Sequence, residues 1–393
     1  MTMTLPPLRL TGATVLRDAR LLPEAIGLAD GMLTDAALPE VDLTGYLVLP
    51  GIVDLHGDGF ERHIAPRPSA PMPLAFGLRA AEREAAAHGL TTAWFAQSWS
   101  WEGGLRGPDH AERVMAALAE HRAEAMLDLR LQIRCETHLF DEDDRLLAAI
   151  GRFGVDYVVF NNHLPEAILL AEAGSPTLAA WAERDGCAPE TFRRRLYDAL
   201  ARARSVPRRL LTLARAFDAL GLRYGSHDDP DGATRDYFHA LGARIAEFPQ
   251  SRGAASVART LGDPVLMGAP NVVRGGSQAG HVAARDLLVE GLVDALVSDY
   301  HTPCLPAAAW ALSDCGLLPF ARAWEMISTR PAAIMGLADR GTLAPGQRAD
   351  LVIMNPRTRG IEATIAGGRL AYLAGEAGAR LLARTPGLRY AAE

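Results

Sequence analysis

The sequence predicts an α/β protein, namely a (β/α)8 TIM barrel with a small β-sandwich domain formed by both termini. Three observations lead to this fold. Residues 51 to 340 alternate short apolar segments with segments of helical spacing, the apolar segments number eight, and both chain ends contain β-branched runs broken by glycine and aspartate. Eight strand-then-helix units are typical of a TIM barrel. We expect the small β domain at 1–50 plus 341–393 and the catalytic barrel at 51–340.

Composition sets the broad class. The 393 residues are 49% hydrophobic and 22% charged, which suits a soluble globular protein with a large core. A net charge of −7 does not favour nucleic-acid binding. The four cysteines form no CxxC pair, the first residues contain no charged segment followed by an apolar run, and nowhere do 18 apolar residues follow one another. These features predict a cytoplasmic protein with reduced thiols and no membrane partner.

The first barrel strand is expected in LPGIVDLHGD, residues 49 to 58. Its apolar run is typical of a strand buried on both faces of a parallel sheet. Side chains two positions apart point the same way, so His56 and Asp58 should emerge together at the carboxyl end, where TIM barrels place their active sites. Both could reach a divalent metal ion about 2 Å away. An isolated HxD motif is more often an ordinary strand end, so the other strands must decide.

Seven further strands and the elements around them complete the chain. Glycine closes several of the helical segments between the strands. The longest interruption, 165 to 210, predicts extra helices over the barrel mouth, where a lid could lie. After the barrel, strands begin near Gly341 and Ile361, and the stretch from Glu376 is expected to be a tail that ends in a short helix. The predicted strands lie at 90–98, 127–138, 156–163, 222–229, 243–249, 264–271 and 293–300.

Polar residues gather at the carboxyl ends of five of these strands. A barrel brings those ends into one ring, so residues far apart in the chain become neighbours. Imidazoles with carboxylates suit Zn²⁺, with Mn²⁺ or Fe²⁺ as alternatives, in one or two ions. The residues are His56, Asp58, Glu136, His138, His163, His227, Asp228, Asp229, Asp299 and His301. From these we predict the metal ligands His56, Asp58, Glu136, His163, His227 and Asp299, with the choice between His163 and His138 left open.

The ligand set indicates hydrolysis. The chain contains no lysine, since all 40 basic residues are arginines, so a carboxylated lysine cannot bridge two ions and Glu136 becomes the natural bridge. A metal-activated water is a good nucleophile near neutral pH. Asp299 could bind metal and also take the proton of that water, with Asp229 as the second catalytic candidate.

Arginines and glycines near the strand ends offer sites for phosphate. In the segment NVVRGGS, the forked guanidinium of Arg274 is followed by glycines whose N–H groups can closely approach an anion. Ordinary surface salt links are the alternative for each arginine. The predicted phosphate-binding residues are Arg67, Arg134, Asn271, Arg274, Gly275, Gly276 and Ser277.

Taken together, these motifs resemble the amidohydrolase superfamily. Its pattern is HxH or HxD on the first strand, a bridging carboxylate, two histidines, a last-strand aspartate and a sandwich domain introduced by a segment like GTLAPGQRAD, residues 341 to 350. More narrowly, SHDD (226–229), IAEFP (245–249), LMGAPNVVRGGS (266–277) and LVSDY (296–300) resemble the phosphonate-utilisation branch of that superfamily. The resemblance implies a metal-dependent diphosphatase that splits ribose 1-methylphosphonate 5-triphosphate, a small anionic substrate, into the 5-phosphate and pyrophosphate. A homodimer is implied only at family level.

Three loops depart from the pattern of that branch: HGDGFERH (56–63), HLPEA (163–167) and GGSQAGH (275–281). They would touch substrate, whereas the ligand set is intact. The alternative function is therefore an amidohydrolase that acts on a C–N bond, in an amide, a cyclic amide or a deamination. An inactive scaffold is disfavoured, because buried charges are costly to keep without a role.

Overall fold

The computed structural model describes residues 4–67, 70–184 and 186–384. Its central sheet has eight parallel strands, and their order across the sheet is their order in the chain. Seven strands fall within the segments that the sequence predicted, and β9 extends one residue beyond its segment, which confirms the TIM barrel. The strands are β8 (Ile52–Gly57), β9 (Leu90–Trp99), β10 (Asp128–Glu136), β11 (Tyr157–Asn161), β12 (Arg223–His227), β13 (Ala246–Glu247), β14 (Val265–Gly268) and β15 (Ala295–Val297).

The first and last barrel strands meet at their carboxyl ends. Gly57 forms an isolated parallel bridge with Asp299. The Asp299 backbone N–H donates to the His56 carbonyl at 2.9 Å, and its own carbonyl accepts from the Asp58 N–H at 2.9 Å. Glycine is needed at position 57 because a Cβ there would lie 2.7 Å from the Ser298 Oγ. This seam therefore holds three predicted ligands in register through the backbone.

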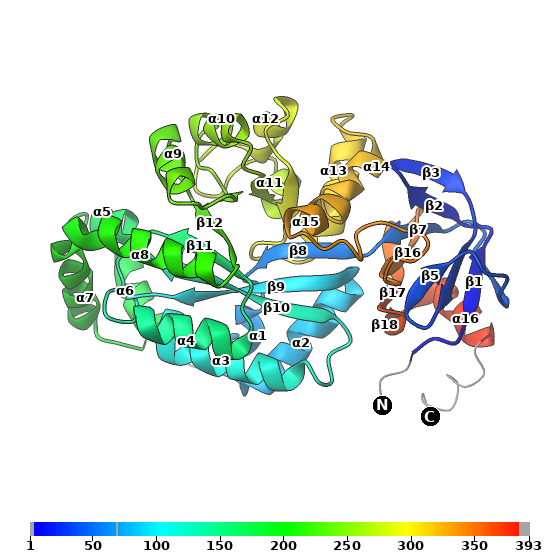
Figure 1. Ribbon diagram of the computed structural model, residues 1–393, viewed down its shortest axis with the longest axis horizontal. Coiled ribbons are helices and arrows are strands. Elements are labelled where there is room, and N and C mark those ends of the chain that lie inside the picture. Colours follow the sequence, from blue (N-terminus) through cyan, green and yellow to red (C-terminus); the bar gives the residue numbers. More distant parts are fainter. Residues whose placement is uncertain (1–3, 68–69, 185, 385–393) are drawn as a thin grey trace.

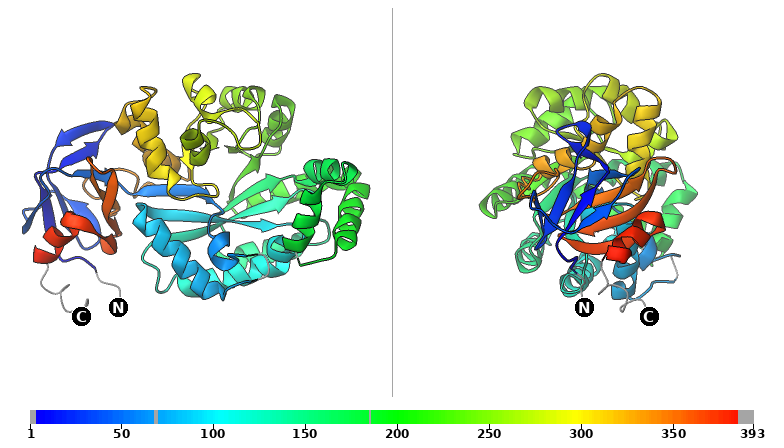
Figure 2. Two further views of the ribbon diagram at one scale, coloured as in Figure 1. Left: turned by 180° about the vertical axis from the view of Figure 1, so that it is seen from behind. Right: turned by 90° about the vertical axis from the view of Figure 1, so that its right-hand side faces the viewer.

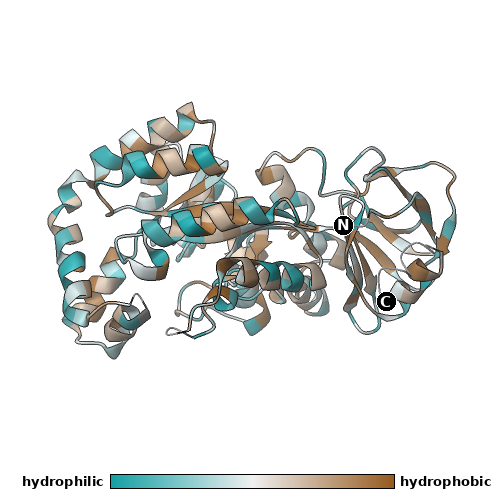
Figure 3. Ribbon diagram, turned by 90° about the horizontal axis from the view of Figure 1, so that it is seen from below, coloured by the Kyte–Doolittle hydropathy of each residue, from teal (hydrophilic) through white to brown (hydrophobic). Residues whose placement is uncertain are grey.

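Helices surround the sheet and bury its outer face. Figure 3 shows brown, apolar strands inside and helices with teal outer faces, the pattern expected of helices that pack one apolar face on a sheet. Among the helices of the described residues, none has the length and apolar run that crossing a lipid bilayer requires. The helices are α1 (Glu61–Ile64), α2 (Leu74–Ala87), α3 (Pro108–His121), α4 (Asp143–Phe153), α8 (Val206–Ala219), α9 (Gly232–Ala240), α10 (Arg252–Leu261), α11 (Ala269–Arg274), α12 (Ala284–Val289), α13 (Cys304–Asp314), α14 (Phe320–Glu325) and α15 (Thr329–Ile334), with short 3₁₀ turns at Gly104–Arg106 and Ala203–Ser205.

The long interruption after β11 forms the extra helices α5 (Leu164–Glu172), α6 (Pro176–Arg184) and α7 (Pro189–Ala201). They have a hydrophobic cluster of their own, which includes Trp101 from the loop after β9. The Trp101 ring lies 5.6 Å from the Phe192 ring, centroid to centroid. In Figure 1 these helices lie at the end of the molecule opposite the terminal strands. The predicted helices are confirmed, and their role as a lid stays a prediction.

Both chain ends build two further sheets, as predicted. One has the order β5-β4-β1-β6 and the other β18-β17-β16-β7-β2-β3, and Figure 2 shows them together on one side of the barrel. The strands are β1 (Leu8–Thr11), β2 (Thr14–Arg17), β3 (Arg20–Pro23), β4 (Ile26–Ala29), β5 (Met32–Thr34), β6 (Glu40–Asp42), β7 (Leu47–Pro50), β16 (Leu351–Asn355), β17 (Gly360–Ala366) and β18 (Arg369–Leu373).

Helix α16 (Gly375–Arg384) corrects the expectation of a tail from Glu376. Its Ala377 and Leu381 side chains belong to the buried core of the terminal sheets, so the stretch begins as a docked helix. Residues 385–393 lie outside the described residues. The exact domain boundaries at 50 and 341 remain predictions.

Candidate metal centre and substrate cavity

A polar cavity of about 350 Å³ opens at the carboxyl ends of the barrel strands. Its volume lies within the usual range for small-molecule sites. The predicted ligands His56, Asp58, His227 and Asp299 line it, as does Arg134. Residues separated by more than 240 positions in the chain therefore meet here, as the barrel predicted.

The first candidate metal group consists of His56, Asp58 and Asp299, whose ligand atoms lie within 4.8 Å of one another. Asp299 has a backbone φ of +54°, and Asp228, after β12, has a φ of +60°. Such left-handed backbone is uncommon outside glycine, and its clustering at strand ends fits a functional site. Burial, followed by the charge of Asp58, raises the pKa of Asp299 to about 7.

Glu247, at the end of β13, forms hydrogen bonds with two imidazoles. Its Oε2 faces Nδ1 of His56 and Nδ1 of His227, each at 3.0 Å. Its Oε1 accepts from the Gln132 amide at 2.5 Å and from the Tyr157 hydroxyl at 2.6 Å. Burial opposes ionisation of this fully buried carboxyl, but the two imidazoles outweigh it and hold its pKa well below the usual range. An ionised carboxylate can only accept, so both Nδ1 atoms carry hydrogen, and in the neutral rings the lone pair lies on Nε2.

Sequence reasoning missed Glu247. The available signal was one charged residue inside the apolar run IAEFP, since a buried charge needs partners.

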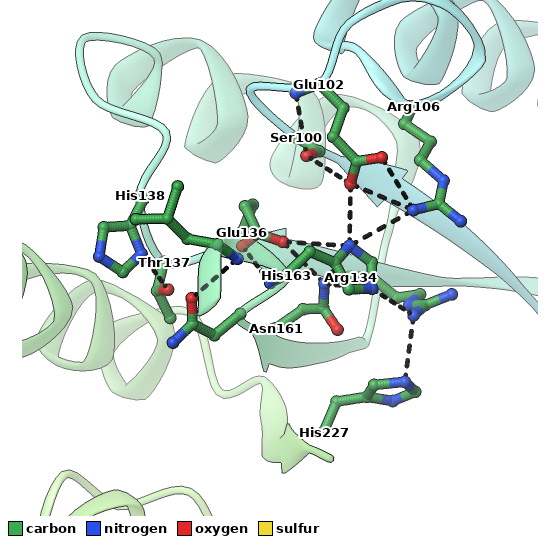
Figure 4. Close-up of polar contacts among 12 residues, drawn as sticks. Ser100, Glu102, Arg106, Arg134, Glu136, Thr137, His138, Asn161, His163 and His227 are labelled. Atoms are coloured by element: carbon green, nitrogen blue, oxygen red, sulfur yellow. Dashed lines mark hydrogen bonds and ion pairs between the residues drawn. The ribbon is translucent and has the colours of Figure 1, made fainter. Parts of the chain in front are cut away.

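Glu136 belongs to a different candidate metal group, with Glu102 and His163. Its Oε1 accepts from the His163 backbone N–H at 2.8 Å, and its Oε2 accepts from the Asn161 amide at 2.7 Å. Burial, followed by the charge of Glu102, raises the pKa of Glu136 to about 8. Figure 4 shows this network beside Arg134. The bridging role predicted for Glu136 stays a prediction, since Glu136 groups with other residues than His56.

Glu102 was also missed from the sequence. It comes from the loop after β9 and is fully buried. Its Oε1 faces Nδ1 of His163 at 2.8 Å, and its Oε2 pairs with Arg106 at 2.9 Å. The contact between Glu102 and His163 joins residues 61 positions apart. Spacing along the sequence could not predict such a contact.

Asp229 and His138 point elsewhere. Asp229 accepts from the Ser226 hydroxyl at 2.5 Å and pairs with Arg235 at 3.3 Å, and it is absent from the cavity lining, whereas Asp228 is present. His138 lies with its Nδ1 2.9 Å from the Thr137 Oγ1, also away from the lining. His163 belongs to a candidate metal group of the described residues and His138 does not, so the geometry favours His163 as a ligand. The catalytic role of Asp229 stays a prediction.

The predicted phosphate-binding residues divide into two sets. Asn271, Gly276 and Ser277 line the cavity. Arg274 is exposed and donates to the hydroxyl of Tyr300, a lining residue, at 3.3 Å. Like Arg274, the remaining two do not line the cavity: Arg67 is exposed, and Gly275, with a φ of +80°, ends helix α11.

The chemistry of the donors fits a divalent ion. His56 presents an imidazole nitrogen, and Asp58 and Asp299 present carboxylate oxygens, a mixture that transition metals prefer. A TIM barrel with such a ring at its strand ends defines a class of metal-dependent barrel hydrolases.

Comparison with known proteins identifies the family. A profile of the amidohydrolase family matches residues 203–372. Over 330 residues the chain is 32% identical to the alpha-D-ribose 1-methylphosphonate 5-triphosphate diphosphatase of Escherichia coli (strain K12), covering 81% of this chain and 86% of that protein. An imidazolonepropionase from Deinococcus radiodurans is 31% identical over 185 residues, 42% of this chain and 44% of its own. The crystal structure of dihydropyrimidinase from Brevibacillus agri NCHU1002 matches with a TM-score of 0.60 at 13% identity, covering 95% and 97% of the two chains.

The chain therefore belongs to the amidohydrolase superfamily and is a hydrolase, as the sequence motifs predicted. Members of this superfamily generally use divalent metal ions, and the candidate groups described above are where this chain could hold them.

Proposed function

We propose that this protein hydrolyses ribose 1-methylphosphonate 5-triphosphate to the 5-phosphate and pyrophosphate, in the breakdown of phosphonates. The observation that carries the proposal is the 32% identity to the Escherichia coli diphosphatase over most of both chains. A cavity rich in polar donors supports it, because a triphosphate is strongly anionic while the chain has a net charge of −7. Binding must therefore depend on local cations and N–H groups.

In this proposal His56, Asp58 and Asp299, whose ligand atoms lie within 4.8 Å of one another, hold a divalent ion, with Zn²⁺ first and Mn²⁺ or Fe²⁺ as alternatives. When bound, such an ion supplies Lewis acidity and lowers the pKa of water. Glu247 fixes the tautomer and the orientation of the two imidazoles, since it receives the hydrogen of both Nδ1 atoms.

The protein's own groups then bind and position the substrate. The Arg134 guanidinium, the Asn271 and Ser277 side chains and the Gly276 backbone line the cavity and can contact phosphate oxygens. Water oxygen bonds to the α-phosphorus, the bond between that phosphorus and the α–β bridging oxygen breaks, and pyrophosphate leaves with the electron pair. Asp299, at the edge of the cavity, takes the proton of the attacking water.

The test is to offer the enzyme ribose 5-triphosphate and, separately, cyclic amides and aminopurines, following pyrophosphate and ammonia. Reaction in ¹⁸O-labelled water should place the label in the 5-phosphate. Arg274→Ala should raise KM for the triphosphate at least about tenfold, the scale of one lost charge-assisted hydrogen bond. The matched control is Arg322→Ala, which removes an exposed arginine paired with Glu325 and should change nothing. Turnover confined to C–N substrates would refute the proposal in favour of an amidohydrolase.

A further inference from the structure

Arg134 occupies a position between two imidazoles. Its Nη2 lies 3.1 Å from Nε2 of His227 and 3.4 Å from Nε2 of His163, and its Nη1 lies 3.5 Å from the Asp58 carboxylate. The guanidinium is almost entirely buried, and Figure 4 shows it pointing at both rings. We propose that the Arg134 guanidinium occupies the position between His163 and His227 at which a second divalent ion would otherwise bind. The centre then takes one divalent ion, at His56, Asp58 and Asp299.

The two imidazoles are oriented as ligands toward this position. Glu102 faces Nδ1 of His163 at 2.8 Å, and Glu247 faces Nδ1 of His227 at 3.0 Å. Each ionised carboxylate accepts a hydrogen, so Nε2 of each ring carries a lone pair. Metal-binding histidines are held in this way by carboxylates behind them. Here both lone pairs face the N–H groups of an arginine.

The strand fixes the guanidinium in this place. Side chains at 132, 134 and 136 of β10 share one face, and the Gln132 amide reaches the buried Glu247 inside the barrel. Arg134 pairs in register with Ser98 of β9 and Val159 of β11, so its backbone lies in the interior of the sheet. A divalent ion bound by His163 and His227 would need to lie about 2 Å from each Nε2, in the space that Nη2 fills. An arginine keeps its charge at any working pH and would repel the ion.

The carboxylate expected to bridge two ions is directed elsewhere. Both Glu136 oxygens accept hydrogen bonds, from the His163 backbone and the Asn161 amide. Glu136 falls outside the group formed by His56, Asp58 and Asp299. A third group of the described residues, His56, His227 and Glu247, includes a carboxylate that does not line the cavity. His56, Asp58 and Asp299 all line it.

The experiment counts bound metal. Metal-free protein is titrated with Co²⁺ by calorimetry, and bound ions per chain are measured by elemental analysis after dialysis. Wild type should bind one equivalent. Arg134→Met, close in length but uncharged, should bind a second, and His163→Asn in that background should remove it again. Arg134→Lys keeps the charge and should stay at one, as should the control Arg322→Met.

The outcomes are distinct. Two equivalents in wild type, or one in a folded Arg134→Met protein, would overturn the inference. If Arg134→Met fails to fold, the counts in wild type and in Arg134→Lys still test it, and two equivalents in either would overturn it. The inference rests on the metal centre of the proposed function but not on the substrate, so failure to release pyrophosphate leaves it standing. Binding of no ion would overturn both.

Discussion

Replacing Glu247 with glutamine should weaken metal binding by about 10- to 100-fold while the barrel stays folded. Glutamine has the shape of glutamate and can keep all four contacts. Its amide oxygen can accept from His56 and His227, its NH₂ can donate to the Tyr157 hydroxyl, and Gln132 can turn its amide to offer the Oε1 that has no hydrogen-bond partner among the described residues. The substitution therefore removes chiefly the charge.

The magnitude follows from that loss. A carboxylate behind an imidazole raises its basicity, and losing such a partner typically lowers metal affinity 10–100-fold, or about 1.4–2.7 kcal/mol. Glu247→Ala removes all four contacts and leaves buried donors unpaired, so it should also lower the free energy of unfolding, by about 3–5 kcal/mol.

Affinity is measured by competition with a chromophoric chelator, and stability by urea unfolding of the metal-free protein. Glu290→Gln is the control, because Glu290 is exposed and pairs only with exposed Arg252 in the contacts described. Unchanged metal affinity in Glu247→Gln would refute the view that Glu247 orients and polarises the ligands.

Other substitutions test separate parts of the molecule. Asp299→Asn should lower kcat on the triphosphate by about 10² or more, the scale of losing a general base, and near wild-type steady-state turnover would assign the proton to another residue. Burial, and then Arg113, lowers the pKa of His110 to about 4 from 6.5. The unfolded chain therefore binds the proton more readily, and stability from this residue, complete above pH 6.5, is lost as the pH falls toward 4. His110→Asn should reduce that loss by up to about 1.4 kcal/mol per pH unit. If the urea midpoint fell equally in wild type and in His110→Asn between pH 7 and pH 5, the prediction would be contradicted. Trp101→Ala should lower the free energy of unfolding by about 3–5 kcal/mol, because it empties the cluster under α5–α7, and an unchanged urea midpoint would count against that packing.

The barrel was predictable because its strands are buried on both faces. A run such as VDALVS can hardly be anything but a core strand, and the residue after it, Asp299, then has a known direction. Physical reasoning on strand ends therefore located His56, Asp58, His227 and Asp299 at one cavity.

What lies behind or beyond the strand ends was harder to predict. Glu247 and Glu102 act on histidines through contacts that depend on folded geometry, and no motif marks them. The glycine after Arg274 was interpreted as a phosphate contact, but in the structure it adopts the left-handed conformation that ends helix α11. A glycine after an arginine is compatible with a phosphate contact and with a helix end, and only the backbone angle in the structure distinguishes the two.

The junction between β7 and β8 fixes the first ligand-bearing strand of the barrel to the terminal sheets. Only Gly51 separates the two strands, and a Cβ at that position would lie 2.3 Å from the Thr91 Oγ1, so the joint is tightly packed. A displacement of the terminal sheets would be transmitted through Gly51 to β8, the strand that leads to His56 and Asp58. Heat that loosens these sheets should release the metal in the same transition, and a chain trimmed to the barrel alone would lose the fixed end of its first ligand strand. New substrate ranges can therefore arise more readily at the opposite end, among α5–α7, where change does not disturb this junction.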